Sequence, residues 1–178
     1  MKPGRTLNAD DRALLEALLR DIGPRLYGYV RKAFNNVDAE DVIADVFARA
    51  ADNIDALRAA KRKDLYLLTA ARNACRDRFR RKQPASISHE RLADTEHPAA
   101  QPAGCASRSE EIERLREAVT QLPDTQREVV VLRMTAGLKF EDIARLIGIP
   151  LGTALSRMNA AIGRLRRELG VTHVCRRR

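Results

Sequence analysis

Two stretches of helical apolar spacing, separated by a segment that has none, constrain the fold of this chain more than any other feature. Residues 9–82 are rich in alanine, leucine and arginine, and their apolar residues recur every three or four positions, which is the period of an amphipathic helix. The same spacing resumes near Ser107. No segment shows sustained period-two alternation, so we expect no β-sheet. The sequence therefore predicts an all-α fold.

The segment between the two stretches, residues 83–108, has the composition of a flexible linker. Pro84, Pro98 and Pro102 lie among serine, alanine, histidine and glutamine residues without apolar periodicity. Fully extended, the segment spans roughly 90 Å at about 3.3–3.6 Å per residue. We therefore expect two small helical domains, residues 1–82 and 109–178, joined by this linker.

Glycine, proline, asparagine and charged clusters interrupt the apolar pattern and separate about four helices in each domain. These interruptions are Gly23-Pro24, Asn35-Asn36, residues 61–64, Pro123, Gly137 and Gly148-Ile149-Pro150. The expected helices are 9–21, 25–34, 38–54, 64–82, a helix from near Ser107 to Leu122, 125–135, 140–147 and 153–169.

Composition and charge exclude several classes of protein. The 178 residues include 3 cysteines without paired spacing, which argues against a disulfide-stapled secreted scaffold. No apolar run suits a transmembrane helix or a signal peptide, so we expect a cytoplasmic protein. The net charge of +9 favours a polyanionic partner, nucleic acid before a membrane surface. An acidic block at 38–55 and basic blocks at 72–82 and 157–178 predict more than one partner surface.

No motif for catalysis or metal binding is present. The chain lacks a glycine-rich phosphate loop, a His-Glu-x-x-His motif and a Cys-x-x-Cys motif. The three histidines and the two cysteines of the linker and tail match no zinc-site spacing. They are His89, His97, Cys105, His173 and Cys175. We therefore expect no enzymatic activity, no cofactor and no metal. Cys75 is expected to fill the core, and Cys105 is the cysteine to test for a redox role.

An acidic stripe borders the apolar face of the expected helix 38–54. At 100° per residue, Asp41, Asp45 and Asp52 fall within about 60° of Asp38. Such a stripe is either a solvated face or a docking surface for a basic protein, and its charge would repel DNA.

The expected helix 64–82 carries an asparagine among arginines. Thr69, Asn73, Arg76 and Arg80 share one face. Arginine neutralises phosphate, an asparagine amide can both donate to and accept from a base, and Tyr66 can stack on an unpaired base. The alternative is a solvated basic helix.

The last helices have the spacing of a helix-turn-helix, with a glycine-containing turn before a helix rich in serine and arginine. The expected inward residues are Ala154, Leu155, Met158, Ala161, Ile162, Leu165 and Leu169, and the outward ones include Ser156, Asn159, Ala160, Gly163 and Arg167. The outward face is a candidate DNA reader, and the alternative is a helical hairpin within a core.

Three segments in this order resemble the extracytoplasmic-function (ECF) group of the bacterial sigma-70 family. They are DAEDVIADVFARA (38–50), LYLLTAARNACRDRFRR (65–81) and LPDTQREVVVLRMTAGLKFEDIARLIGIPLGTALSR (122–157). The resemblance implies that residues 1–82 are region 2 and residues 109–178 are region 4 of a sigma factor. Such a protein binds core RNA polymerase and directs promoter-specific initiation. The alternatives are a sigma-like decoy that binds an anti-sigma protein, and a simple helix-turn-helix regulator of duplex DNA.

The resemblance also implies roles for individual residues. Contact with the clamp coiled coil of the largest polymerase subunit is implied for Asp38, Asp41, Val42, Asp45 and Arg49. Binding of the opened −10 element is implied for Tyr66, Asn73, Arg76 and Arg80. Reading of the −35 element is implied for Thr153, Ser156, Arg157, Asn159, Ala160 and Arg164. An anti-sigma partner is implied as well, and it would hold the protein at the membrane when it is itself membrane-bound.

The chain departs from the family pattern in both DNA-binding helices. Tyr66 stands where the family usually has tryptophan, and the chain contains no Trp. Leu155, Ala160 and Ile162 occupy positions that are usually basic. Each lost phosphate contact lowers the affinity and its salt dependence, so we expect the polymerase to supply much of the binding energy.

Overall fold

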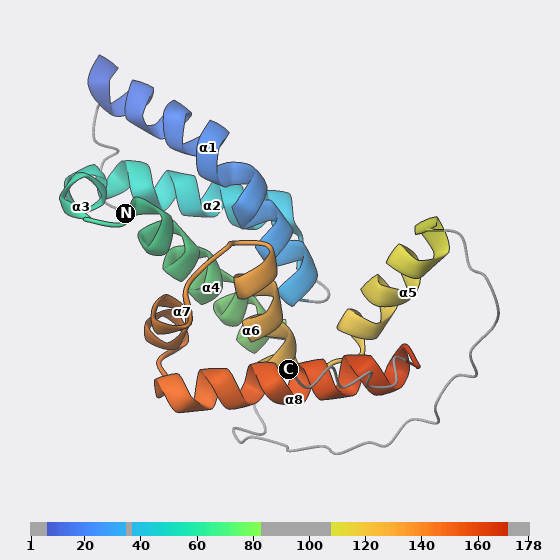
Figure 1. Cartoon of the computed structure of the whole chain (residues 1–178). Helices are drawn as coiled ribbons and strands as arrows, with labels where there is room; N and C mark the ends of the chain where they lie inside the picture. The colour runs from blue at the N-terminus through green and yellow to red at the C-terminus, as the bar shows by residue number, and fades with distance from the viewer. Residues whose placement is uncertain (1–6, 35–36, 83–107, 171–178) are drawn as a thin grey trace.

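The computed structural model describes residues 7–34, 37–82 and 108–170, and within these ranges the chain forms helices and no strand. The expected all-α fold is confirmed (Figure 1). The helices are α1 (Ala9–Ala33), α2 (Ala39–Asp52), α3 (Ile54–Ala59), α4 (Lys63–Lys82), α5 (Arg108–Thr120), α6 (Asp124–Met134), α7 (Phe140–Ile147) and α8 (Leu151–Glu168). The expected linker, 83–108, lies outside the described residues except for Arg108, which begins α5.

The first helix is continuous, and the prediction of two helices separated at Gly23-Pro24 is wrong. Pro24 removes one backbone donor, at a cost of about 3 kcal/mol in a helix interior. Leu18, Ile22 and Leu26, on both sides of the proline, are buried on one face of α1. Each buried side chain of this size contributes about 1.5–3 kcal/mol, so packing offsets the cost of the proline.

The first helical unit, α1–α4, is a bundle in which α1, α2 and α4 contact one another. Asn8 caps α1 by accepting from the backbone N–H of Asp11 at 2.7 Å. Asp38 caps α2 by accepting from the N–H groups of Glu40 and Asp41, which is a preferred role for aspartate. The sequence does not predict α3 as a separate helix, because its six residues hold only two buried side chains, Ile54 and Leu57.

The second helical unit, α5–α8, contains the expected helix-turn-helix. Gly148 ends α7 in the left-handed conformation, with φ 78° and ψ 41°, and its N–H donates to the carbonyl of Ala144 at 2.9 Å. Glycine adopts this conformation without the steric cost of a side chain. Pro150 then precedes α8, which begins at Leu151, two residues before the expected start.

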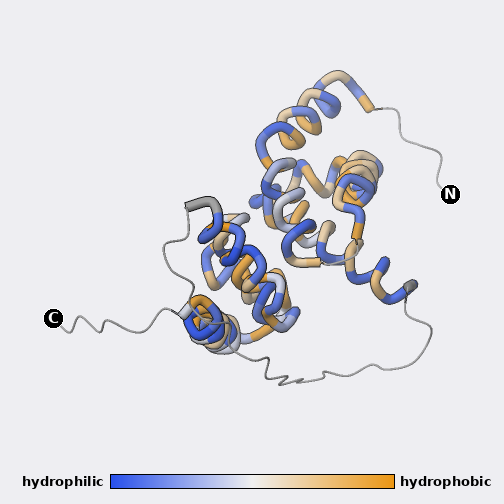
Figure 2. Tube along the Cα trace, turned by 90° about the vertical axis from the view of Figure 1, so that its right-hand side faces the viewer, coloured by the Kyte–Doolittle hydropathy of each residue, from blue (hydrophilic) through white to orange (hydrophobic). Residues whose placement is uncertain are grey.

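The two helical units pack against each other. Helix α1 contacts α6, and α4 contacts α7. One cluster of buried apolar residues runs from Leu26 and Val30 of α1 to Val129 and Leu132 of α6. Figure 2 shows apolar positions recurring along the helices of both units. The structure therefore places the two expected domains in one shared core.

Candidate functional site

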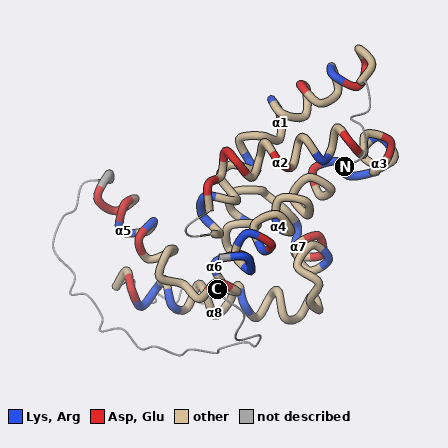
Figure 3. The backbone as a smooth tube through the Cα atoms, turned by 180° about the vertical axis from the view of Figure 1, so that it is seen from behind, with Lys and Arg blue, Asp and Glu red and all other residues tan. Residues whose placement is uncertain are grey.

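Helix α2 carries several acidic residues along its length (Figure 3), and they form a stripe beside its buried face. Asp38, Asp41 and Arg49 are exposed, and Asp45 is half-buried. Val42 is fully buried in the core. It therefore supports the helix from inside and cannot be part of a docking surface, contrary to the expectation from the resemblance.

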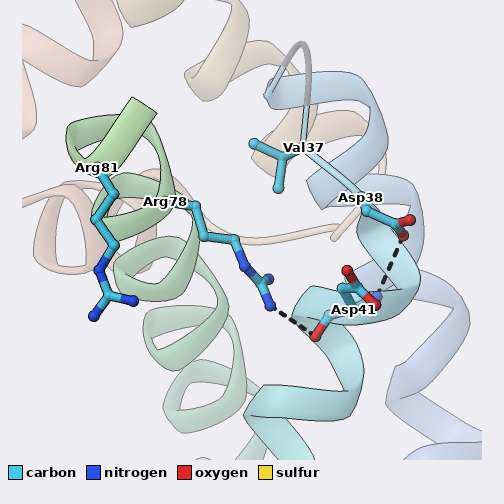
Figure 4. Close-up of a pocket in the computed structure, with 5 residues that line it drawn as sticks. All are labelled: Val37, Asp38, Asp41, Arg78 and Arg81. Atoms are coloured by element: carbon cyan, nitrogen blue, oxygen red, sulfur yellow. Dashed lines mark hydrogen bonds between the residues drawn. The ribbon is translucent and has the colours of Figure 1, made fainter. Parts of the chain in front are cut away.

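Arg78 of α4 compensates part of this acidic stripe. Its Nη2 lies 2.5 Å from Oδ2 of Asp45. The same atom donates to the backbone carbonyl of Asp41 at 3.1 Å (Figure 4). The two side chains are 27% and 48% exposed, so solvent screens the pair and its contribution to stability is small. Periodicity could not reveal this contact, because it joins residues 33 positions apart on two helices.

A shallow hollow of about 250 Å³ lies between the start of α2 and the end of α4. Val37, Asp38, Asp41, Arg78 and Arg81 line it, and Figure 4 shows Arg78 directed toward Asp41. Its walls carry carboxylates on one side and guanidinium groups on the other. These charged groups suit the charged side chains of a protein partner.

The outer face of α4 gathers the residues that the sequence predicts for single-stranded DNA. The helix is unbroken from Lys63 to Lys82, so Tyr66, Asn73, Arg76 and Arg80 fall within about 80° of one another at 100° per residue. Asn73, Arg76 and Arg80 are exposed, whereas Tyr66 is half-buried and packs against the core. This face offers one amide and two guanidinium groups to a ligand.

The outer face of α8 is exposed but weakly charged. Ser156, Asn159 and Ala160 are exposed, and Thr153, Arg157 and Arg164 are half-buried. On the opposite side, Ala154 and Ala161 are fully buried, and Met158 and Leu165 pack against a small cluster with Leu122 and Val130.

The prediction that Leu155 faces inward is wrong. Its side chain is 41% exposed. The buried arc of α8 is centred on Ala154 and Ala161, and Leu155 lies about 100° beyond Ala154 on the helix. The expected apolar arc was therefore too wide by one position.

Neither a metal cluster nor a membrane-spanning helix is found in the described part of the chain. Residues 7–34, 37–82 and 108–170 contain no group of three or more His, Cys, Asp or Glu placed to hold a metal. Over the same ranges no helix is long and apolar enough to cross a membrane. Cys105, the candidate for a redox role, lies outside the described residues.

Both helical units match models of one protein family. Residues 18–85 match Sigma-70 region 2, and residues 112–165 match Sigma-70, region 4. The ECF RNA polymerase sigma factor EcfG of Rhodopseudomonas palustris is 30% identical over 147 residues, covering 80% of this chain and 77% of that protein. The ECF RNA polymerase sigma factor SigW of Bacillus subtilis is 27% identical over 155 residues, covering 82% of this chain and 83% of that protein.

Two solved structures share the fold. The sigma factor RpoE in complex with the anti-sigma factor NepR from Bartonella quintana has a TM-score of 0.67 at 23% identity, and the likeness covers 91% of this chain and 99% of that chain. CnrH in complex with the cytosolic domain of CnrY has a TM-score of 0.62 at 20% identity, with 91% of each chain covered. The matches to both regions and the similarity to EcfG show that this chain belongs to the ECF RNA polymerase sigma factors of the sigma-70 family.

Proposed function

We propose that this sigma factor binds core RNA polymerase through α2 and contacts promoter DNA through α4 and α8. It acts as a specificity subunit and not as an enzyme. The observation that carries the proposal is the arrangement of the first helical unit. There an acidic stripe on α2 and an exposed amide–guanidinium face on α4 lie on two helices that contact each other. Opposite charges on neighbouring helices suit a basic protein and a nucleic acid that meet at one junction.

Docking on the polymerase is assigned to the stripe of Asp38, Asp41 and Asp45, with Arg49 at its end. The partner is the basic clamp coiled coil of the largest subunit. Asp38 also caps α2, so its carboxylate both holds the helix start and contributes charge. When the polymerase binds, the Asp45 carboxylate either keeps its ion pair with Arg78 or breaks it to contact the polymerase.

Binding of the opened −10 element is assigned to Asn73, Arg76, Arg80 and Tyr66. The Asn73 amide would hydrogen-bond a flipped base of the non-template strand, while the two arginines neutralise nearby phosphates. Tyr66 is half-buried, so one ring face at most is available for stacking.

Reading of the −35 element is assigned to α8, through Thr153, Ser156, Arg157, Asn159, Ala160 and Arg164. Two of these six side chains are cationic, and both are half-buried. Because counterion release scales with the number of neutralised phosphates, this contact supplies less affinity than polymerase docking.

An anti-sigma protein is proposed as a further partner. The structure of RpoE holds the anti-sigma factor NepR. The structure of CnrH holds the cytosolic domain of CnrY. The proposed place of action is the cytoplasm, where the polymerase is found. A membrane-bound anti-sigma protein would hold the factor at the membrane until it is released.

Run-off transcription from a pool of genomic fragments tests the proposal. The purified protein, added to bacterial core polymerase, should yield a defined subset of transcripts that core polymerase alone does not produce. Failure to bind core polymerase and to direct transcripts would contradict the proposal. Binding of an anti-sigma protein without transcription would identify a decoy, and a shift of duplex DNA without polymerase would identify a simple regulator.

A further inference from the structure

The first two turns of α8 expose mainly apolar side chains. Leu151 and Leu155 are 40% and 41% exposed, and Gly152 and Ser156 are exposed beside them. Arg157, which follows at the end of the second turn, is half-buried. This end of the helix therefore offers two isobutyl groups and one hydroxyl to a molecule that approaches it.

The position of α8 in its unit leaves these leucines outside the core. Helix α8 packs against α5, α6 and α7, and Figure 1 shows it along the lower edge of the view with those helices above it. At 100° per residue, Leu155 lies about 100° from the fully buried Ala154 and about 40° from the exposed Asn159. One turn separates Leu151 from Leu155, so the two side chains are neighbours on the helix surface.

Gly152 leaves the backbone beside this apolar surface open. It is not among the glycines with positive φ, and a Cβ at this position would have no heavy atom within 4 Å. The protein's own packing therefore does not require a glycine there. The missing side chain lets another molecule come close to the helix next to Leu155.

Helix α8 is the second helix of the helix-turn-helix, and the N-terminal residues of such a helix contact base edges in the major groove. In that groove the base pairs present hydrogen-bond donors and acceptors and one apolar group, the C5-methyl of thymine. A leucine against guanine or cytosine removes water from polar atoms that it cannot hydrogen-bond. A leucine against the thymine methyl group buries apolar surface on both partners. Leucine at this place thus favours thymine.

We propose that Leu155, with Leu151 one turn before it, selects thymine in the −35 element by packing against the C5-methyl group. The inference rests on the proposed function and names a base that this helix prefers. Ser156 and Asn159 lie beside Leu155 on the exposed face, where they can hydrogen-bond neighbouring bases. An apolar contact neutralises no phosphate, so it adds affinity without adding salt dependence.

Replacement of thymine by uracil tests the proposal, because it deletes the methyl group and leaves the Watson–Crick pairing unchanged. The wild-type protein with core polymerase first selects promoters from the pool of genomic fragments. Each thymine of the −35 element, on either strand, is then replaced singly by uracil, and the affinity of the holoenzyme is titrated. At one position or more we expect the affinity to fall about fourfold, which corresponds to the loss of one buried methyl-sized group.

The Leu155→Ala variant identifies the side chain that makes the contact. Its holoenzyme should bind the thymine promoter at least fourfold more weakly, and uracil should then make no further difference, because the methyl group has lost its partner. The slope of log affinity against log salt concentration should stay the same. The matched control is Leu19→Ala on α1, where the leucine is 48% exposed. It should change neither the affinity nor the response to uracil.

A second probe separates the methyl group from the hydrogen-bonding pattern of the base. Replacing the sensitive T·A pair by C·G should weaken binding. Replacing that cytosine by 5-methylcytosine restores a methyl group at the same ring position while keeping the hydrogen-bonding groups of cytosine. The wild-type holoenzyme should recover part of the lost affinity, and the Leu155→Ala holoenzyme should recover none.

The outcomes distinguish this proposal from the proposed function. If uracil has no effect at any thymine of the element, or if its effect persists in Leu155→Ala, the thymine contact is wrong while promoter-directed transcription stands. Holoenzyme binding that does not depend on the −35 sequence also overturns the thymine contact, and it leaves polymerase docking by α2 standing. If the protein neither binds core polymerase nor directs transcripts, the proposed function is wrong and the thymine contact with it.

Discussion

Asp45 shows how a single side chain can serve two contacts. Its place in the acidic stripe of α2 follows from helical spacing, but its ion pair with Arg78 depends on how α2 and α4 pack. Substitution at Asp45 therefore changes both the proposed docking charge and a contact within the protein. An informative experiment has to separate these two effects.

Reversing the charge at this position should weaken polymerase binding. We expect Asp45→Arg to lower the affinity for core polymerase at least tenfold, or about 1.4 kcal/mol, because a cation then faces a basic partner. The measurement is a binding titration with labelled protein. Asp21→Arg, an equal charge change at an exposed position of α1, should leave the affinity within a factor of two.

A double exchange isolates the docking role. Asp45→Arg combined with Arg78→Asp restores an ion pair between the two helices while position 45 stays cationic. Recovery of thermal stability without recovery of polymerase binding is expected. Full recovery of binding would show that Asp45 acts only by holding Arg78.

Cys75 should be unreactive in the folded protein. Burial raises the pKa of the Cys75 thiol from 9.0 to about 12, so very little of the reactive thiolate is present at neutral pH. Alkylation followed by peptide mass spectrometry should label Cys75 only after denaturation. Rapid labelling in the native protein would contradict the burial.

The raised pKa of Cys75 makes the free energy of unfolding depend on pH. The unfolded chain releases the thiol proton above pH 9, whereas the folded protein retains it to about pH 12. The stabilising contribution is thus complete below pH 9 and declines as pH rises, by at most about 1.4 kcal/mol per pH unit. The stability difference between the wild-type protein and Cys75→Ala should narrow over this range.

At the scale of helices, the sequence predicts most boundaries well, because glycine, proline and capping residues act locally. The turn at Gly148 and the start of α2 at Asp38 are of this kind. The continuity of α1 across Pro24 cannot be predicted from local residues, since it depends on burial against other helices. The outer face of α4 could be predicted because it needs only an unbroken helix.

The Asn73 amide on the outer face of α4 should be needed for DNA opening and not for binding to core polymerase. We expect Asn73→Ala to retain core binding and to reduce open-complex formation about tenfold to hundredfold, since good base contacts contribute about 1–3 kcal/mol. Permanganate footprinting on a selected promoter measures opening. Thr69→Ala is the matched control, because the Thr69 hydroxyl already donates to the carbonyl of Leu65. Normal opening by Asn73→Ala would refute the assignment of this helix.

Adding a cation to the outer face of α8 tests whether this face contacts DNA. Ala160 is exposed on the outer face, and Ala160→Arg should add one phosphate contact. The promoter affinity of the holoenzyme should rise, and its logarithmic salt dependence should steepen by about 0.9. Ala17→Arg on α1 adds the same charge away from this face and serves as the control. An unchanged salt dependence would exclude a DNA contact at position 160.

At the scale of the whole molecule, the decisive contacts join residues far apart in the sequence. The pairs Arg72–Glu128 and Tyr29–Glu128 are separated by 56 and 99 positions. Composition predicts a linker between two domains, and it contains no signal that the domains pack together. Helical glycines give no such signal either: a Cβ on Gly28 would lie 2.7 Å from Cγ2 of Thr135, whereas a Cβ on Gly152 or Gly163 would have no heavy atom within 4 Å.

A shared core also predicts how the protein unfolds. With one apolar cluster crossing both units, calorimetry of the wild-type protein should show a single cooperative transition. Gly28→Ala, whose methyl group would lie 2.7 Å from Cγ2 of Thr135, should lower the midpoint temperature of this transition. An unchanged midpoint temperature in Gly28→Ala would show that residue 28 does not limit the packing of the units.

The contact between α1 and α6 lies within one polypeptide, so its strength does not depend on how much of the protein is present. A contact between two chains behaves differently, because it weakens on dilution. Thermal unfolding measured over a hundredfold range of protein concentration should thus give the same midpoint temperature throughout.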